Sequence, residues 1–450
     1  MPVDERERIQ TELILSNLEG SAAYPAPDQW DRVPQVDYLY REYAILTREQ
    51  DADRVEQAVT RILHQAGYGD APNDHERETR RERVSAEVVR LVVPRTPVLV
   101  PAILDRLDED LGPGVGRPDQ IVFVCPHSCP IPEPTPVPPG TPPVPPPSGS
   151  GSNADLMRDK PETGHGGEGV SVVVVDTGLT EDAAAGHPWL EGVRGAPEET
   201  YVKLDGQDVI APYAGHGMFV AGVARCVAPG ATVYVERAFT IAGADYESSL
   251  LHSLEHALGL NPDVLVLPFT MSTRRDLPPL TFDDLFERHT GDLKGLVMLA
   301  AVGNDRAQRL MWPAAYPEVI SVGALAVNGR ERAVFSNYGR WVDVYAPGED
   351  LINAFPVGTY VYREPPNAGT SKPFDGMAIW GGTSFAVPIV AGLVAARMSV
   401  TGENARQAAD SLLRFACSQA IRGVGAVLYP GQAVADRPGR LGRQRRASVS

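Results

Sequence analysis

The sequence predicts two domains: a small N-terminal α+β domain, followed by a larger α/β domain with a parallel sheet flanked by helices. Three observations lead to this fold class. From Gly169 onward, short continuous apolar runs alternate with helical patterns, which is typical of a parallel sheet buried on both faces. The region before it has its own succession of strands and helices. A proline-rich tract separates the two regions.

Composition excludes several classes of protein. An apolar content of 43% is too high for a chain that is disordered throughout, and 4 cysteines in 450 residues are too few for a disulfide-stapled scaffold. The net charge of −17 argues against a surface that binds nucleic acid globally. No run of about 18 apolar residues is free of charge or proline, so we expect no membrane-spanning helix.

The start of the chain lacks the features of a secretory signal. Residues 4–8 are all charged, and the apolar patch at 13–15 is too short for the core of a signal peptide. We therefore expect a cytoplasmic protein, in agreement with its few cysteines. Cys125 and Cys129 flank a histidine, but a single C-x3-C pair is a poor zinc pattern. We expect reduced thiols there, with a metal site or a disulfide as the alternatives.

Residues 1–126 are predicted to form the N-terminal α+β domain. No catalytic combination of residues is visible in it, and the charged stretch 70–83 is predicted to be a loop. The expected elements, from apolar periodicity, are strands at 38–46, 88–93 and 121–125 and helices over 49–66 and 99–107.

Residues 127–164 are predicted to be a linker. Prolines concentrate in 130–147 and a Gly/Ser stretch follows, so the segment favours an extended and then a flexible conformation. Its expected role is that of a spacer, although such tracts also dock SH3-like partners. At the other end, 431–450 is predicted to be a basic disordered tail, with docking or phosphorylation near Ser448 as the alternative.

Residues 165–430 are predicted to form the α/β domain. In such sheets functional groups cluster at the carboxyl ends of the strands. Asp176 ends the first strand directly after four valines, where a carboxylate needs a cationic or hydrogen-bonding partner. The expected strands are 170–175, 232–235, 264–267, 295–301 and 319–322.

Three further polar residues stand at positions suited to acyl-transfer chemistry. His216 lies between two glycines at the start of an apolar helix. Ser384 begins another helix, where backbone N–H groups and the helix dipole stabilise an oxyanion. Asn304 follows a buried strand as a side-chain donor. The pattern predicts that Ser384 attacks a carbonyl, His216 transfers its proton, and Asp176 holds the imidazole. The Asn304 amide and the Ser384 N–H would hold the oxyanion.

Four motifs in chain order make the α/β domain resemble the subtilases, the subtilisin-like serine proteases. They are VVVVDTGL, GHGMFVAG, AAVGN and GGTSFAVP, and the resemblance covers about 169–430. It implies a seven-stranded parallel sheet between helices and an endopeptidase that works through an Asp-His-Ser triad and an acyl-enzyme. The implied partner is a protein or peptide substrate. We expect no cofactor and no metal, and neither nucleic acid nor membrane as a partner.

Several positions depart from the family pattern. Met218 and Phe219 replace a threonine and a histidine beside His216, and Phe385 and Ile389 replace a methionine and a histidine after Ser384. The substrate-pairing strand, usually Ser-Leu-Gly, aligns with 268–270, which reads Pro-Phe-Thr. Because proline removes a backbone donor, either that alignment is off or substrate pairing differs here.

The role of the N-terminal domain stays open at this point. Its size and alternation resemble the α+β propeptide that subtilases often carry, which chaperones folding and inhibits the site. A retained module that binds a regulatory protein fits the long spacer equally well. The alternative to an active enzyme is a catalytically degenerate subtilase-like scaffold that acts as a protein-interaction module.

Overall fold

The computed structural model describes residues 3–68, 79–124, 133–138, 140–145, 166–289 and 295–430. Its central element is a seven-stranded parallel sheet in the order β16-β15-β14-β13-β7-β11-β8. The predicted fold class is confirmed, because the five apolar runs all form strands of this sheet. In chain order the strands are β7 (Ser171–Asp176), β8 (Arg194–Gly195), β11 (Thr232–Arg237), β13 (Val264–Leu267), β14 (Val297–Ala301), β15 (Val319–Leu325) and β16 (Val344–Pro347).

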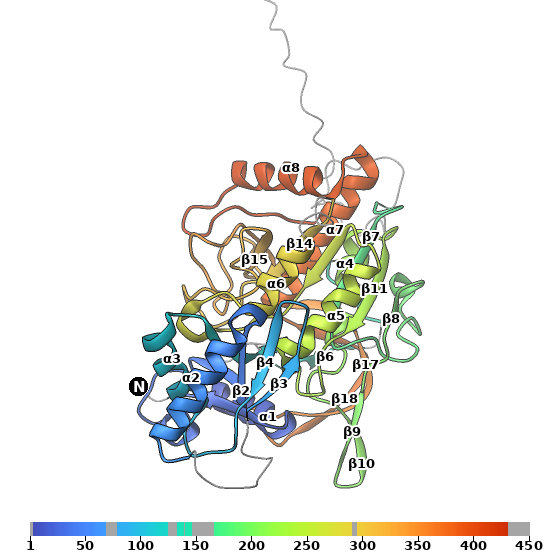
Figure 1. The fold of residues 1–450 in the computed structure, drawn as a ribbon. Helices are drawn as coiled ribbons and strands as arrows, with labels where there is room; N and C mark the ends of the chain where they lie inside the picture. Colours follow the sequence, from blue (N-terminus) through green and yellow to red (C-terminus); the bar gives the residue numbers. More distant parts are fainter. Residues whose placement is uncertain are drawn as a thin grey trace, which may run out of the picture.

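Helices cover both faces of this sheet (Figure 1). Strand β7 shows why its valines are continuous: Val172 and Val174 belong to one apolar core, whereas Val173 and Val175 belong to the other. The first core is completed by α4 (His216–Val227), α7 (Thr383–Thr401) and α8 (Ala405–Ser418), and the second by α5 (Glu247–Gly259) and α6 (Leu280–His289).

Helix α7 is long, apolar and largely buried. Among the described helices it alone is long and apolar enough to span a membrane, but 83% of its apolar window is buried inside the protein. It packs against α4 and β13 through β16, so its apolar composition serves the core. This packing fixes the N-terminal end of α7, where Ser384 lies.

A second, five-stranded sheet lies beside the first, in the order β6-β18-β17-β10-β9. Its outer strand β6 comes from the segment predicted to be a linker, and it pairs antiparallel with β18. An edge position suits Pro136, which has no N–H to donate. The strands are β6 (Thr135–Pro136), β9 (Tyr201–Leu204), β10 (Gln207–Ile210), β17 (Leu351–Val361) and β18 (Ser371–Trp380).

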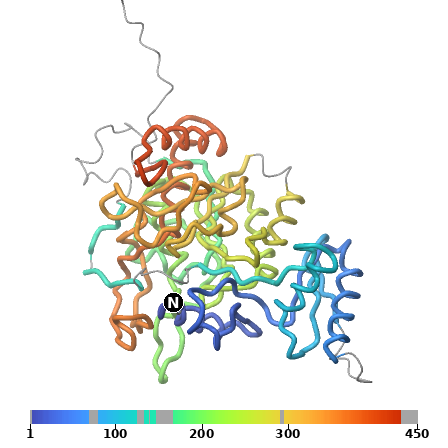
Figure 2. Tube along the Cα trace, turned by 90° about the vertical axis from the view of Figure 1, so that its left-hand side faces the viewer, coloured from blue at the N-terminus to red at the C-terminus, as the bar shows by residue number. Residues whose placement is uncertain are grey.

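The N-terminal domain lies against one side of the α/β domain (Figures 1 and 2, blue to cyan). Its sheet has the order β12-β5-β2-β4-β3, with β1 beside β2, and β12 (Ala244–Tyr246) comes from the α/β domain. The two domains therefore share one sheet. Its own elements are α1 (Glu5–Asn17), β1 (Ser21–Tyr24), β2 (Tyr38–Arg48), α2 (Ala52–Gln65), β3 (Arg80–Arg83), β4 (Val88–Val92), α3 (Val100–Leu111) and β5 (Gly116–Phe123).

The end of the charged stretch 70–83 differs from its prediction as a loop. Residues 80–83 form β3, an exposed edge strand that carries no apolar residue. Ion pairs compensate for the missing apolar face: Arg81 pairs with Asp53 and Glu56 of α2, and Glu82 pairs with Arg90 of β4. The predicted tail at 431–450 and the cysteines at 125 and 129 lie outside the described residues.

Candidate active site

Asp176 and His216 form a fully buried pair at the carboxyl end of β7. His216 Nδ1 lies 2.8 Å from both carboxylate oxygens of Asp176, and both side chains are 0% exposed. Since an ionised carboxylate only accepts hydrogen bonds, the proton of this contact is on Nδ1. Asp176 Oδ1 also accepts from the Thr177 N–H at 2.6 Å. The contact fixes the orientation of the imidazole, with Nε2 as the ring nitrogen that Asp176 does not contact.

The turn before His216 requires glycine. Gly215 is the N-cap of α4 with a φ of 81°, and a Cβ there would collide with the ring of Pro356. This glycine lets the chain turn directly into the helix, so that His216 is its first residue. His216 is thereby placed over the end of β7, opposite Asp176.

Two of the departures from the family pattern, Phe219 and Phe385, belong to an aromatic cluster around His216. The ring of Phe385 lies 5.0 Å from that of His216 and 4.5 Å from that of Phe219. Trp380 adds an edge-on contact to His216 at 5.5 Å. Phe219 on α4 and Phe385 on α7, two of the residues that differ from the family pattern, therefore pack against each other beside His216. Met218 accepts a hydrogen bond through its sulfur from Thr180 at 2.9 Å.

Ser384 and Asn304 meet at the start of α7. Ser384 is 3% exposed and lies in the first turn of the helix, after Gly382 as N-cap. Asn304 Oδ1 accepts from the N–H of Thr383 at 2.8 Å, so the amide is fixed beside the start of α7. With its oxygen engaged, the amide has its NH2 group as the remaining donor for an oxyanion.

A segment of the chain itself occupies the space in front of Ser384. The Ser384 hydroxyl lies 3.0 Å from the carbonyl oxygen of Val124 and 2.9 Å from that of Pro268. Among the described residues, no hydrogen bond joins Ser384 to His216, and the buried Nε2 of His216 has no partner. The structure therefore brings Asp176 and His216 into direct contact, whereas the hydroxyl of Ser384 is hydrogen-bonded to backbone carbonyl groups.

This segment is held as an extra strand between two parts of the α/β domain. On one side, Phe123 and Thr270 exchange both backbone hydrogen bonds, at 3.0 and 2.9 Å. On the other side, β5 pairs antiparallel with β12, and the Val124 N–H donates to Gly243 O at 2.9 Å. The missing N–H of Pro268 removes no hydrogen bond from this pairing, because Phe123 pairs with the backbone of Thr270.

Glu198 is a residue near the site that sequence reasoning missed. Its Oε2 accepts from the N–H of Gly215 at 2.9 Å, directly before His216. Burial raises the pKa of Glu198 to about 8, and the charge of Asp176 acts in the same direction, against hydrogen bonds from Thr177 and Gly215. A glutamate in an irregular, polar stretch gives no signal of this position in the sequence.

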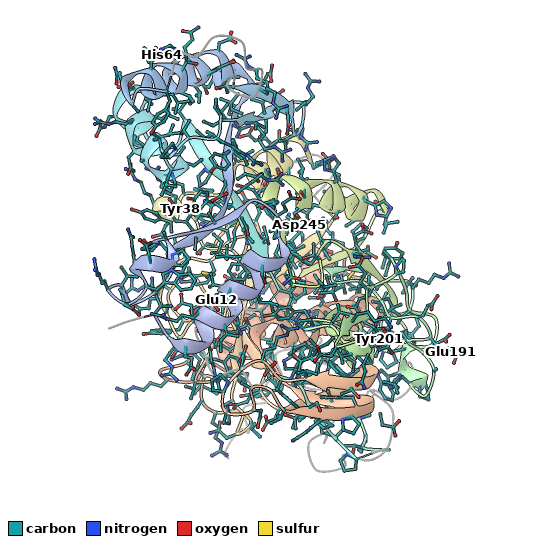
Figure 3. The ribbon with its side chains drawn as sticks, turned by 90° about the horizontal axis from the view of Figure 1, so that it is seen from below. Glu12, Tyr38, His64, Glu191, Tyr201 and Asp245 are labelled. Atoms are coloured by element: carbon teal, nitrogen blue, oxygen red, sulfur yellow. The ribbon has the colours of Figure 1, made fainter. Side chains whose placement is uncertain are left out.

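Buried carboxylates also hold the N-terminal domain against α5. Asp119 of β5 accepts from the Ser248 N–H at 3.2 Å in the first turn of α5, and pairs with Arg41 at 2.9 Å. Arg41 stacks over the ring of Tyr246, 3.6 Å from its centroid. Beside them, burial raises the pKa of Glu247 to about 8, with Asp119 as the next cause. Figure 3 shows this junction from below, with Asp245 labelled beside the N-terminal strands.

Two other features of the sequence lie away from the site. Arg274 and Arg275 pair with Asp105 and Asp108 of α3, so they serve the contact between the domains. His256 of α5 contacts Glu236 at 2.8 Å, and the described residues contain no group of three metal-ligating side chains.

Comparison with known proteins agrees with this geometry. The profile of the subtilase family matches residues 167–416. Subtilisin NAT of Bacillus subtilis subsp. natto is 29% identical over 252 residues, which are 52% of this chain and 57% of that protein. An intracellular serine protease of Paenibacillus polymyxa is 30% identical over 248 residues, 51% of this chain and 66% of that protein. The chain thus spans less than two thirds of the length of either relative.

A solved structure shares the fold over most of the chain. It is that of fervidolysin from Fervidobacterium pennivorans, a keratinolytic enzyme related to subtilisin. The TM-score is 0.54 at 18% identity, with 89% of this chain and 62% of that chain covered. Because the family profile matches 167–416, more than half of the 450 residues, the chain belongs to the subtilase family.

Proposed function

We propose that this protein is a serine endopeptidase that hydrolyses protein or peptide substrates through Asp176, His216 and Ser384. One observation carries the proposal: a peptide segment lies as an antiparallel strand in front of Ser384, with the carbonyl oxygen of Val124 3.0 Å from the serine hydroxyl. This contact is a hydrogen bond from the serine hydroxyl to a carbonyl oxygen, and it supports the proposal because an extended peptide fits the space in front of Ser384.

In the proposed reaction, Ser384 gives its proton to Nε2 of His216 and its oxygen attacks the substrate carbonyl carbon. The unpartnered, buried Nε2 is the acceptor available for this proton. Asp176, 2.8 Å from Nδ1, stabilises the imidazolium that forms. The Asn304 NH2 group and the Ser384 N–H stabilise the oxyanion, His216 then protonates the leaving amine, and water hydrolyses the acyl-enzyme.

The N-terminal domain is proposed to block the site in the intact chain. Its last strand fills the substrate position between β12 and Thr270, and hydrogen bonds and ion pairs at α5 hold the domain in place. Two outcomes are open: the chain cuts itself after β5 and the domain acts as a propeptide, or the domain stays as a retained module that a regulatory protein displaces.

The test is to treat the purified chain and its Ser384→Ala variant with a fluorophosphonate probe and to compare their migration on a denaturing gel. If Ser384 is the nucleophile, the probe should label the wild type and should not label Ser384→Ala. Self-cleavage shortens the wild type by its N-terminal domain and leaves Ser384→Ala intact. Labelling that survives in Ser384→Ala would refute the assignment of the nucleophile. Absence of labelling and turnover after the N-terminal domain is displaced would favour the scaffold alternative.

A cytoplasmic location is proposed alongside the activity. It has support from the intracellular serine protease of Paenibacillus polymyxa among the relatives. Fractionation of cells that express the tagged chain tests it, and recovery of the tag outside the cytoplasm would contradict it.

A further inference from the structure

Part of the predicted linker is bound to the five-stranded sheet as a peptide would be. Thr135 and Pro136 pair with Ile379 and Ala378 on the outer edge of β18. Further along, Val144 and Ile352 exchange two backbone hydrogen bonds, at 2.8 and 3.2 Å. The first contact adds a short strand to the edge of β18, and the second is made to β17, so these residues are bound to the sheet rather than forming a free spacer.

Glu133, just before this strand, is held in a cradle of donors. Its carboxylate accepts from the hydroxyl of Tyr360 at 3.0 Å, from the N–H of Arg363 at 3.0 and 3.2 Å, and from the N–H of Glu364 at 3.0 Å. Two consecutive backbone N–H groups that point to one anion form a nest. A carboxylate fits it because it accepts several hydrogen bonds and donates none.

The residue after Glu133 is also recognised. Pro134 is buried, and its carbonyl oxygen accepts from the hydroxyl of Tyr362 at 3.0 Å. The rings of Tyr360 and Tyr362 lie 5.3 Å apart and are 2% exposed each. Proline suits this position because it has no N–H that needs a partner and its chain is already extended. Tyr360, Tyr362 and the backbone N–H groups of residues 363 and 364 therefore bind a glutamate followed by proline in an extended segment.

The nearby acidic side chain of Glu364 is turned to another partner. Its Oε1 accepts from Nε2 of Gln10 on α1 at 2.7 Å, while its backbone N–H faces Glu133. Burial raises the pKa of Glu364 to about 7, and the charge of Glu133 contributes to this shift. The raised pKa reduces the negative charge that Glu364 carries beside Glu133 near neutral pH.

We propose that the outer edge of β18 and the turn that carries Arg363 and Glu364 form a peptide-binding exosite for extended segments with a glutamate followed by proline. Residues 133–136 are its ligand within the chain. The proposal rests on the proposed peptidase function in one respect: the segment follows Val124, which lies at Ser384, so the exosite takes the part of a substrate that is C-terminal to the cleaved bond.

The direct test uses full chains with Ser384→Ala and a fluorescein-labelled peptide of the sequence of residues 133–145. In one chain, residues 133–145 are replaced by a Gly/Ser stretch of equal length, which empties the exosite. We expect this chain to bind the peptide, and to bind its counterpart with glutamine in place of glutamate about ten-fold more weakly, because charge-assisted hydrogen bonds are lost. The unreplaced chain should bind about ten-fold less peptide, because its own segment competes at high effective concentration.

A second variant covers the case in which the replaced chain does not fold. Glu133→Gln in the otherwise unchanged chain weakens the internal ligand alone, so it should bind more peptide than its parent. Equal affinity for the two peptides would overturn carboxylate recognition, and no binding to either variant would overturn the exosite. These assays contain no nucleophile, whereas fluorophosphonate labelling of chains with Ser384 reports the proposed peptidase function separately.

Discussion

The two apolar cores of the central sheet and the junction with the N-terminal domain are stabilised in different ways. The cores consist of aliphatic and aromatic residues from strands and helices, such as Val172 to Val175 of β7. The junction also has an apolar cluster, which includes Ile121, Phe123 and Tyr246. It adds buried charged and polar groups around the start of α5, namely Asp119, Arg41 and Glu247. Apolar burial does not depend on pH, but buried carboxylates do. We therefore expect the stability of the junction to depend on pH more than that of the two apolar cores.

The largest expected effect is on kcat, from substitutions of the proposed catalytic residues in the α/β domain. Ser384→Ala and His216→Ala should each lower kcat by about 10⁶-fold, as triad knockouts do in subtilisin. The measurement is hydrolysis of a peptide substrate after the N-terminal domain has been displaced. Ser399→Ala on the same helix is the matched control, because Ser399 bonds to Ala396 and Gly167 away from the site. A loss of less than ten-fold for Ser384→Ala would contradict the assignment.

The next effect concerns Asn304, which connects the loop after β14 to α7. Asn304→Ala should lower kcat by about 10²–10³-fold, the loss known for an oxyanion donor in subtilisin. Asn304→Asp separates catalysis from structure, because a carboxylate still accepts from the Thr383 N–H but donates nothing. If the aspartate variant kept full kcat, Asn304 would be a structural residue only.

The junction should lose stability as pH rises. Burial raises the pKa of Glu247 in the folded chain to about 8, from 4.5. Its contribution is thus complete below pH 4.5 and is lost as pH rises through 8. We expect the free energy of unfolding to fall by about 5 kcal/mol over this interval through Glu247. Glu247→Gln should flatten the dependence in denaturant titrations at pH 5, 7 and 9. The matched control is the exposed Glu12→Gln, which should leave the slope unchanged. A slope that Glu247→Gln also leaves unchanged would assign the pH dependence to other groups.

The smallest expected effect is on stability, from the hydrogen bond that joins Tyr362 to Pro134 of the predicted linker. Tyr362→Phe removes the hydroxyl that donates to Pro134 O and keeps the ring. We expect a loss of about 1 kcal/mol in the free energy of unfolding, the value of one hydrogen bond. Tyr201→Phe is a matched control, since that hydroxyl donates to Val357 O at an exposed position. Equal losses in both variants would show that the linker contact has no special strength.

Sequence patterns predicted the strands of the central sheet well, but they did not predict how the N-terminal domain and the linker contact the α/β domain. The apolar runs at 170–175 and 264–267 became β7 and β13, because a strand buried on both faces must be apolar at every position. Asp176 and His216, placed by their motifs, do meet at 2.8 Å. By contrast, β12 gave no signal that it would join the sheet of the N-terminal domain, since three residues are too short for a pattern.

The linker shows the same limit. Proline-rich composition predicts an extended conformation, and residues 135 and 136 are indeed extended. Composition contains no information on the nest at Arg363 and Glu364 that binds Glu133, because its donors are backbone groups present in every sequence. Glu198 was missed for a related reason, since its contact is the N–H of Gly215.

The sequence by itself determined the α/β class, the family and the residues that can carry acyl-transfer chemistry, because these depend on local periodicity and on motifs. Only the tertiary structure decided what lies in front of Ser384. The end of β5 fills that space, and the linker continues along β18. Such contacts join backbone groups far apart in the chain, and backbone donors and acceptors are the same for every residue except proline. Their partners are therefore fixed by the assembled fold and not by side-chain pattern.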